Sequence, residues 1–503
     1  MLRNIYRHTI FSTKGRAVFI FLAFFTWSSL ALAQQNQTMY YMGVPQSRFM
    51  NPALQGDCNS YFGIPGINST YLGINNNSVG FEDIIFKGPD SYGDSLISIL
   101  HPTYDIDEFL AKLKPVNRIS PEVYVSLLSF GFRAGENFFF LDVADRMYSH
   151  FSFPKDLATL VLKGNEDFIN SSADLSSLSA SATYFREIGL GFSREFAEGL
   201  FIGVKAKMLF GNANVSLQNN GLSLEIDESN LFSHTVNADL NLNFGYPVEV
   251  FHDPETGYID SLFIPDPDEG MLFNFGNPGF GIDLGAVYKI NDQFSVSASV
   301  VDLGFIKWKK DVTNLRVQGT YEFTGIDVSS MLIAGDTSTF DDALENISDT
   351  LITIFNPKDT YDPFTTYTPT KIYIGGSFQL NDNIGFGLLS KTLIEHGKLW
   401  ESFTMSANVK AGGFLTTSLS YSITNSTYNN VGFGLSLRGG PIQFYFVTDK
   451  LFYKLSRYSI PNEGTNPTNI ILPSNLSSFN FRFGLNLVFG CKPKRPNDRP
   501  LIF

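Results

Sequence analysis

The sequence predicts an all-β fold, a transmembrane antiparallel β-barrel of about fourteen strands. Apolar, mostly aromatic residues occupy every second position of residues 479–489, so a strand there has one apolar and one polar face. An alternating run of about eleven residues has the length of a membrane-spanning strand, whereas strands of a soluble sandwich, the alternative explanation, usually have about five or six. After residue 33 no continuous apolar segment could cross a bilayer as a helix, so only a closed barrel would satisfy the backbone in lipid.

The N-terminal residues 1–33 are predicted to be a cleavable secretory signal. Basic residues precede an apolar run, 17–33, that ends in Ala31-Leu32-Ala33. The alternative is a membrane anchor, but the run is short for a spanning helix and its small terminal residues favour cleavage after Ala33. The next residue is not Cys, so we expect no lipoprotein.

The composition argues against nucleic-acid binding and favours a lipid-facing surface. The formal net charge is −13, and the predicted signal carries basic but no acidic residues, so the mature chain is more acidic still. Nucleic-acid binding needs basic patches instead. The chain has 49 Phe and 22 Tyr, a content that the aromatic girdles and apolar band of a membrane barrel would use. A soluble, aromatic-rich β-protein is the alternative.

Alternating runs recur along the chain in pairs, joined by short turns that contain Gly, Asn, Asp or Glu. Gly, Asn and Asp tolerate the positive φ that tight hairpins need. The pairs are 122–134 with 137–152, 180–195 with 199–216, 278–290 with 294–308, 367–380 with 384–396, 400–411 with 414–425, and 430–438 with 442–453. The connections between pairs are longer, and short turns on one side with long loops on the other are typical of outer-membrane barrels.

The strand count follows from these pairs. Adding 60–75 as the first strand and 478–490 as the last gives fourteen strands, and the barrel then spans residues 60–490. Segment 233–247 also alternates, but including it alone would make the number odd. It is either an extracellular extension, or it pairs with another segment such as 221–226 to give sixteen strands.

Two long connections are expected to contain short helices. In residues 105–113 the apolar side chains lie on one helical face, and residues 340–351 repeat this pattern. These helices either pack on the barrel rim or form an apolar landing site for a hydrophobic ligand. Beyond the last strand, residues 491–503 are predicted to be a basic periplasmic tail.

The chain has two Cys, Cys58 and Cys491. One precedes the first predicted strand and the other follows the last, and these two strands are neighbours in a closed barrel. Both ends would face the oxidising periplasm, so we hypothesise a disulfide across the closure. The alternative is two unpaired thiols, which mass spectrometry of non-reduced peptides distinguishes.

The last strand resembles the terminal-strand signal of bacterial outer-membrane barrels, which reads polar, Gly, hydrophobic, aromatic. Arg482, Gly484, Leu487 and Phe489 stand at this spacing, although a basic tail follows them here. The resemblance implies that the barrel assembly machinery is a partner.

Residues 34–60 resemble the N-terminal segment of the FadL-like outer-membrane proteins through Asn51-Pro52-Ala53. In that superfamily the motif belongs to a hatch that folds inside a fourteen-stranded barrel and blocks it, which implies a hatch over residues 34–59. Residues 277–288 and 302–305 resemble strands of the Bacteroidota branch, which includes PorV and PorQ of the type IX secretion system. The chain is most similar to an uncharacterised family of that branch.

Charges on the polar faces of the predicted strands are expected in the lumen. They are Asp283, Lys289, Lys410, Arg438 and Arg482. We expect these side chains to pair with one another or with the hatch. The alternative is that they line a polar path, as in a porin.

The resemblance implies a function only loosely, because one fold hosts many functions. The first prediction is an outer-membrane channel that takes up hydrophobic or amphipathic small molecules and is plugged by its N-terminal segment. An inward kink of the first strand at Pro65-Gly66 would mark a lateral opening. The second is a non-transporting partner or scaffold of a secretion or envelope complex, as PorV is. A general porin ranks third, since a plug obstructs diffusion.

No motif predicts an enzyme, a cofactor or a metal site. The six His form neither H-E-x-x-H nor a close pair with Cys, and no P-loop or dinucleotide motif has a strand–turn–helix context. His150 lies on a candidate strand, so a Ser/His hydrolase in the barrel wall is the enzymatic alternative. The acidic loop 253–270 lacks EF-hand spacing. Expected partners are outer-membrane lipids and either a hydrophobic ligand or an envelope protein, in the bacterial cell outer membrane.

Overall fold

The structure is a computed structural model that describes residues 37–491 apart from 89–95, 103, 231–232, 267–269, 271–273, 324–352, 396, 425–426, 452–454, 463–464 and 474–477. The predicted signal, the tail beyond Cys491 and the amphipathic segment 340–351 lie outside the described residues. Among the residues that are described, no helix is long and apolar enough to cross a membrane.

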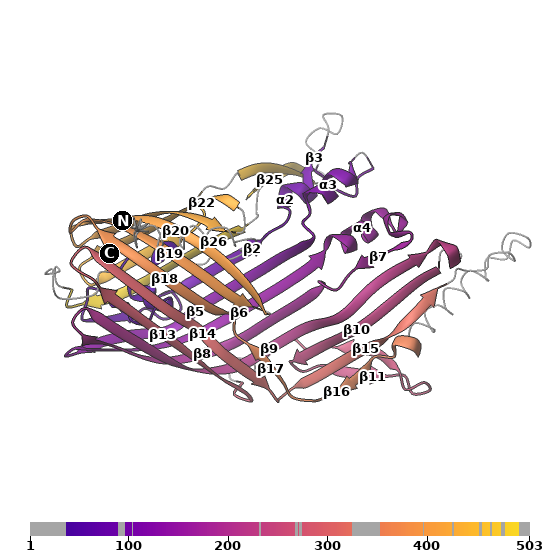
Figure 1. Cartoon of the computed structure of the whole chain (residues 1–503), viewed down its shortest axis with the longest axis horizontal. Helices are drawn as coiled ribbons and strands as arrows, with labels where there is room; N and C mark the ends of the chain where they lie inside the picture. Colours follow the sequence, from indigo (N-terminus) through magenta and orange to yellow (C-terminus); the bar gives the residue numbers. More distant parts are fainter. Residues whose placement is uncertain are drawn as a thin grey trace, which may run out of the picture.

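A closed antiparallel barrel forms the body of the molecule (Figure 1). In order around the wall its strands are β1 (Ser60–Gly63) with β2 (Thr70–Asn76), β5 (Val116–Ala134), β6 (Asn137–Pro154), β8 (Ser179–Ala197), β9 (Leu200–Asp227), β13 (Asn277–Lys289), β14 (Phe294–Trp308), β18 (Thr370–Gln379), β19 (Ile384–Glu395), β20 (Lys398–Ala411), β21 (Leu415–Thr424), β22 (Thr427–Gly439), β23 (Ile442–Thr448) and β26 (Ser478–Phe489). Because β1 and β2 share one position, between β26 and β5, the barrel has fourteen strands. The predicted fold class is confirmed.

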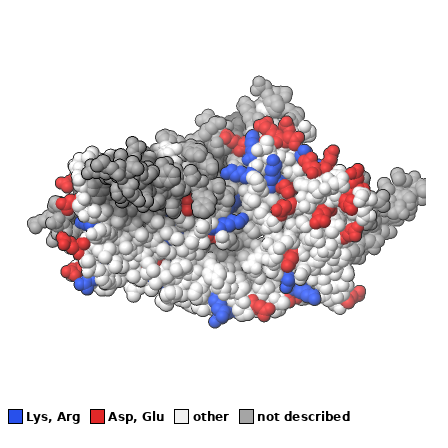
Figure 2. Space-filling view, in the orientation of Figure 1, with Lys and Arg blue, Asp and Glu red and all other residues white. Residues whose placement is uncertain are grey.

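The two faces of the wall differ as the alternation predicts. In β26 the buried side chains that face the lumen alternate with aromatic and apolar side chains that face outward. Large apolar side chains are likewise exposed on the outer face of the other strands, where lipid would cover them. Examples are Val296, Ile374, Leu388, Met405 and Leu419. Figure 2 shows a broad uncharged band over the wall, with Lys, Arg, Asp and Glu gathered beyond it at both ends.

The first strand is interrupted, which corrects the prediction of one continuous strand over 60–75. Both β1 and β2 pair with β26 and β5, but residues 64–69 between them leave the ladder. Only two residues of β26 separate the two paired stretches, so the six residues of 64–69 form a bulge. Pro65-Gly66, the predicted kink, lies in this bulge.

The bulge carries Asn68 into the lumen, where this residue is fully buried. The Tyr445 hydroxyl donates to the Asn68 carbonyl oxygen at 3.0 Å. Gly484 of β26 lies directly behind, and a Cβ at this position would overlap the Asn68 carbonyl. Packing against Asn68 therefore requires glycine at position 484, independently of the place of this residue in the terminal-strand signal.

Strand β9 has 28 residues, about 90 Å of extended chain, and it contributes to two parts of the sheet. Its first part pairs with β13, and its second part, from Val215 onward, pairs with β10 (Ser233–Gly245). Beyond β10 follow β15 (Val312–Phe323) and β16 (Lys358–Thr360). We call this four-stranded part, which includes the second part of β9, the extended sheet; it continues beyond one end of the barrel, at the right in Figure 1. Segment 233–247 is thus an extension that pairs with 221–226, and the count stays at fourteen.

The remaining elements belong to the long connections. They are α2 (Phe81–Ile84), α3 (Ile106–Lys112), α4 (Lys155–Lys163), η4 (Glu166–Phe168), η5 (Glu228–Asn230), β7 (Ser171–Asp174), β17 (Phe364–Tyr367) and the hairpins β3 (Ile85–Lys87) with β4 (Leu96–Ser98), β11 (Glu249–His252) with β12 (Ile259–Phe263) and β24 (Leu455–Asn462) with β25 (Thr465–Pro473). Helix α3 confirms the helix predicted over 105–113, and the Asp105 carboxylate caps it by accepting from the Asp107 and Glu108 amides.

Replacing Phe489 with Asp is expected to lower the fraction of assembled barrel, because a charge replaces the last aromatic of the terminal strand. Heat-modifiable migration on gels measures this fraction. Phe132→Asp is the matched control: Phe132 and Phe489 are both register partners of Ser60 and are 46% and 49% exposed. Equal losses in both variants would assign the effect to the lipid face and not to the terminal-strand signal.

Candidate functional site

Residues 37–57 lie inside the barrel. Two short 3-10 helices, η1 (Gln37–Met39) and η2 (Pro45–Phe49), fold this segment into a compact unit. Its apolar side chains form the largest buried cluster of the described chain together with inward side chains of six strands. The members from the wall are Phe201, Val287, Val301, Tyr373, Leu389, Tyr445 and Val447. The core of this barrel is therefore built around its own N-terminal segment.

The start of the segment is held by β19 to β22 and by Asp449. The Asp449 carboxylate accepts from the Thr38 amide at 2.9 Å and from the Thr38 hydroxyl at 2.6 Å. Small residues lie side by side across these four strands, in the register Gly387, Ser406, Ser420, Gly432. A Cβ at Gly387 would overlap the Tyr41 ring, and one at Gly432 would overlap the Thr38 hydroxyl. The strands make room for the segment by omitting side chains.

The predicted motif Asn51-Pro52-Ala53 docks on a second row of small residues. This row runs across β8, β9, β13 and β14 in the register Ser193, Gly203, Gly285, Ser299. A Cβ at Gly285 would overlap Asn51 Oδ1 and lie 2.8 Å from Pro52 Cδ, while one at Gly203 would overlap the Pro52 carbonyl group. At one end of the motif Ser299 Oγ donates to Met50 O at 2.6 Å. At the other end Ser193 Oγ accepts from Gln55 Nε2, also at 2.6 Å.

Asn51 is fully buried, and the hydrogen bonds of its side chain explain why asparagine suits this position. Its Nδ2 donates to the Tyr40 hydroxyl at 3.1 Å and to the Ala286 carbonyl at 3.2 Å. Its Oδ1 accepts from the Ala53 amide at 3.0 Å, which closes a tight turn over Pro52. An amide side chain supplies both the donor and the acceptor that this position needs.

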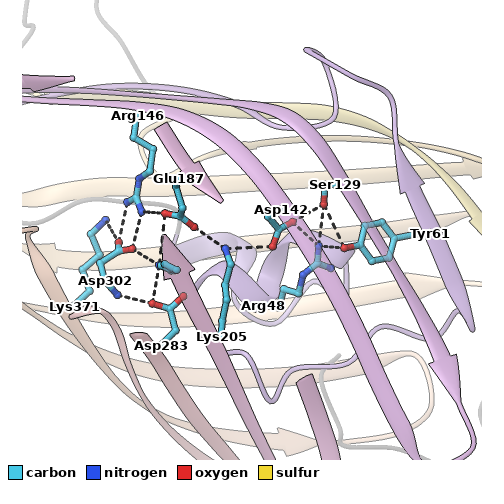
Figure 3. Close-up of polar contacts among 11 residues, drawn as sticks. Arg48, Tyr61, Ser129, Asp142, Arg146, Glu187, Lys205, Asp283, Asp302 and Lys371 are labelled. Atoms are coloured by element: carbon cyan, nitrogen blue, oxygen red, sulfur yellow. Dashed lines mark hydrogen bonds and ion pairs between the residues drawn. The ribbon is translucent and has the colours of Figure 1, made fainter. Parts of the chain in front are cut away.

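A buried charge network continues from the segment along the inner wall (Figure 3). Arg48 of the segment pairs with Asp142 at 3.1 Å, and Lys205 joins Asp142 to Glu187 at 3.3 and 2.7 Å. From Glu187 the pairs run on at 2.6 to 3.4 Å through Arg146, Asp302, Lys207, Asp283, Lys371 and Glu122. Five cations and five anions therefore balance, and every one of these side chains is at most 9% exposed.

Asp302 is the centre of this network. Its carboxylate accepts from both terminal nitrogens of Arg146 at 2.6 and 2.9 Å, from Lys207 at 2.6 Å and from Lys371 at 3.3 Å. The residue sits where the β13–β14 register shifts, at a φ of 61°, a conformation that Asp tolerates better than most residues. The Asp302 amide donates to Asp283 Oδ1 at 2.7 Å, which fixes the bulge.

The predicted lumen charges occupy several places. Asp283 belongs to the charge network, and Lys410 pairs with Asp57 of the N-terminal segment. Arg438 donates to Cys58 Sγ at 3.7 Å. Lys289 lies half-buried at the last position of β13, beside the turn at the rim. Arg482 is buried and donates to Ser69 Oγ at 2.6 Å, from the side of the first-strand bulge.

The structure joins Cys58 and Cys491 in a disulfide. The pair lies next to the β1–β26 closure and packs on a small aromatic cluster that includes Tyr61 and Phe138. The remaining residues of the terminal-strand signal, Leu487 and Phe489, are on the outward face of β26.

Sequence reasoning missed most of the charge network. Apart from Arg48, its members lie at inward positions of strands, so the alternation that identified Asp283 also applies to Lys205 and Lys207 of β9. Arg48 stands three residues before the Asn-Pro-Ala motif and carried no signal of its own.

Three further features bear on chemistry outside the network. His150 lies between Ser120 and Ser179, with Nδ1–Oγ and Nε2–Oγ distances of 3.4 and 3.2 Å. Among the described residues no three His, Cys, Asp or Glu side chains gather as a metal site. In the acidic loop, hydrogen bonds from the backbone and side chain of Thr256 lower the pKa of Asp253.

A family model described as a family of unknown function, DUF5723, matches residues 52–449. The chain belongs to this family. No curated protein matches it. Among solved structures it is similar to the P. putida toluene transporter TodX at 11% identity, covering 88% of this chain and 94% of that one with a TM-score of 0.38. The Ralstonia pickettii toluene transporter TbuX matches at 10% identity, over 89% and 94%, with a TM-score of 0.37.

A Pseudomonas aeruginosa FadL homologue matches at 12% identity, over 92% of this chain and 100% of the other, with a TM-score of 0.35. Scores and identities this low carry no argument about function.

Proposed function

We propose that this protein is an outer-membrane channel that is closed at rest by residues 37–57 and takes up small amphipathic molecules. The observation that carries the proposal is the way this segment is held. The two rows of small wall residues accept it without covalent attachment inside the lumen. Side-chain hydrogen bonds of about 1 kcal/mol each, the shared apolar cluster and the Arg48–Asp142 ion pair hold it there. A segment bound in this manner can be displaced without unfolding the wall.

The lining of the lumen supports an amphipathic ligand. Next to the segment a cavity is bordered both by rings, such as Phe49, Tyr124 and Tyr373, and by the charges of the network. A purely apolar molecule would leave those charges without hydration, whereas a molecule with a polar group could satisfy them. Exit is then axial, past the displaced segment, or lateral, at the bulge of residues 64–69.

The barrel with its uncharged outer band supports an outer-membrane location, and so does the predicted signal. Lipids would cover that band, and the barrel assembly machinery would recognise β26.

A second candidate function is a scaffold for an envelope or secretion protein. The extended sheet of β9, β10, β15 and β16 supports it, because a channel for small molecules does not need four strands that continue beyond the barrel. Native mass spectrometry of protein extracted gently from its own membrane separates the candidates. A retained small mass favours uptake, and a co-purifying protein favours the scaffold.

Replacing Gly285 with Leu is expected to open the channel. The new side chain would occupy the space of Asn51 and Pro52, so the segment must leave its row. Single-channel conductance in planar bilayers should rise, and trypsin should gain access to Arg48, which is buried in the native protein.

The matched control is Gly376→Leu on β18. Its Cβ would meet no atom closer than the Ser295 carbonyl oxygen at 4.0 Å, and its register partners Val296 and Leu388 face outward. This variant should stay closed. A Gly285→Leu barrel in which trypsin reaches Arg48 while the conductance remains at the native level would reject the proposal that residues 37–57 close the channel.

A further inference from the structure

A small cavity lies between the N-terminal segment and the charge network. We call it the chamber. Its lining combines the rings of Phe49, Tyr124 and Tyr373 with Arg482 and eight charged side chains of the network. Five of these residues are cations and four are anions, so the lining carries one positive charge in excess.

The excess cation is Arg482. It is 5% exposed, and among the described residues it forms no ion pair. One of its terminal nitrogens donates to Ser69 Oγ at 2.6 Å, and its Nε–H finds no acceptor among the described residues. A buried charge without a counter-charge is costly, so this guanidinium is a favourable place for an anionic ligand.

Aromatic rings surround the Arg482 guanidinium. The Arg482 guanidinium carbon lies 4.9 Å from the Tyr71 ring centroid, 4.8 Å from Tyr124 and 5.7 Å from Phe49. The Phe49 ring also faces Arg48 and Lys205, both at 5.6 Å. Phe49 of the segment thus occupies the space among three cations.

Other orphaned polar atoms line the same chamber. Within the described part of the chain, the Tyr124 hydroxyl, Arg146 Nε and Glu122 Oε2 have no hydrogen-bond partner. Buried polar atoms are nearly always satisfied, by protein, water or ligand. The unsatisfied hydroxyl and two N–H groups are donors suited to a carboxylate, and the guanidinium fork of Arg482 matches its geometry.

We propose that the chamber binds a small carboxylate with an apolar body, the carboxylate on Arg482 and the apolar body in the place of the Phe49 ring. This inference rests on the proposed function and names the substrate class for it. A charged carboxylate binds a guanidinium more strongly than a phenyl ring does. The ligand therefore displaces Phe49 and loosens the segment that holds it.

The test is isothermal titration calorimetry of the full detergent-solubilised barrel with benzoate as the probe. Benzoate should bind, benzyl alcohol should not, and Arg482→Gln should weaken benzoate binding at least about tenfold. Arg438→Gln, which removes another inward Arg far from the chamber lining, should bind as the native protein does. Equal binding of benzoate and benzyl alcohol, no loss in Arg482→Gln, or no binding at all would overturn the proposal.

A second measurement keeps the test valid where Arg482→Gln fails to assemble. Phe49→Trp places a fluorescent ring beside an intact Arg482, and benzoate but not benzyl alcohol should change its emission. Unchanged emission would overturn the displacement of residue 49. Neither measurement requires the channel to open, so a failure here leaves the Gly285→Leu conductance result standing, and the reverse also holds.

Discussion

Deleting residues 34–56 is expected to turn a closed barrel into a conducting one. In a barrel of eight strands side chains alone fill the interior, whereas porins of about sixteen strands enclose an aqueous channel. Fourteen strands lie between these cases, and in this barrel the N-terminal segment supplies most of the largest buried cluster. We expect a conductance smaller than that of a porin, measured on single channels in planar bilayers.

The deletion is chosen to end before Asp57 and Cys58, which contact Lys410 and Cys491, so the closure of the barrel is untouched. Removing the hairpin β11–β12 instead is the control, because it lies outside the lumen and should leave the conductance unchanged. If the barrel without residues 34–56 stays silent, the wall side chains themselves close the lumen and the segment is not a plug.

Replacing Asp302 with Asn is expected to destabilise the folded barrel by about 3–5 kcal/mol, the usual cost of removing one partner of a buried ion pair. Asn keeps the shape and tolerates the positive φ of 61°. It leaves Arg146, Lys207 and Lys371 without their shared anion in a buried site. Denaturant unfolding in lipid vesicles, followed by tryptophan emission, measures the loss.

Asp145→Asn is the matched control for this prediction. Asp145 binds one cation, Arg186, with distances of 2.7 and 2.9 Å, and both side chains are more exposed than those of the network, at 18% and 15%. Its loss should cost about 1 kcal/mol or less. Equal costs for the two substitutions would mean that Asp302 acts as one ordinary ion-pair partner and that the network is not cooperative.

Much of the wall could be predicted from the sequence because period-two alternation reports directly on two environments. In β26 the apolar residues Phe481, Phe483 and Leu485 alternate with Arg482 and Gly484. This alternation predicts that the apolar set faces lipid and the other set faces the lumen. The hairpin turns were equally readable, since Gly135, Gly199, Gly412 and Gly440 all adopt positive φ in the structure.

The interruption of the first strand was not fully readable. Pro65-Gly66 signalled a kink, but the direction of the bulge depends on partners from distant strands, Tyr445 and Gly484. The length of β9 was underestimated for a similar reason. Residues beyond Val215 continue as a strand because β10 and β15 extend the sheet beside them, which local pattern does not reveal.

The charge network lies further beyond sequence reasoning. Arg48 and Asp142 are 94 positions apart, and Arg146 and Asp302 are 156 apart, yet each pair is in direct contact. Such pairs depend on the register of seven neighbouring strands, and no local signal states that register. The two rows of small residues were invisible for the same reason, since each row consists of one residue from each of four strands.

The Cys58–Cys491 bond has a consequence for the integrity of the chain. It links two residues 433 positions apart, so the polypeptide between them is a closed covalent ring. A single protease cut in any long loop opens this ring but leaves one molecule, because both new ends remain attached through the disulfide. Two cuts within the ring are needed before a fragment is no longer covalently attached to the rest. The protein therefore retains all its strands after the first nick, for as long as this disulfide stays oxidised.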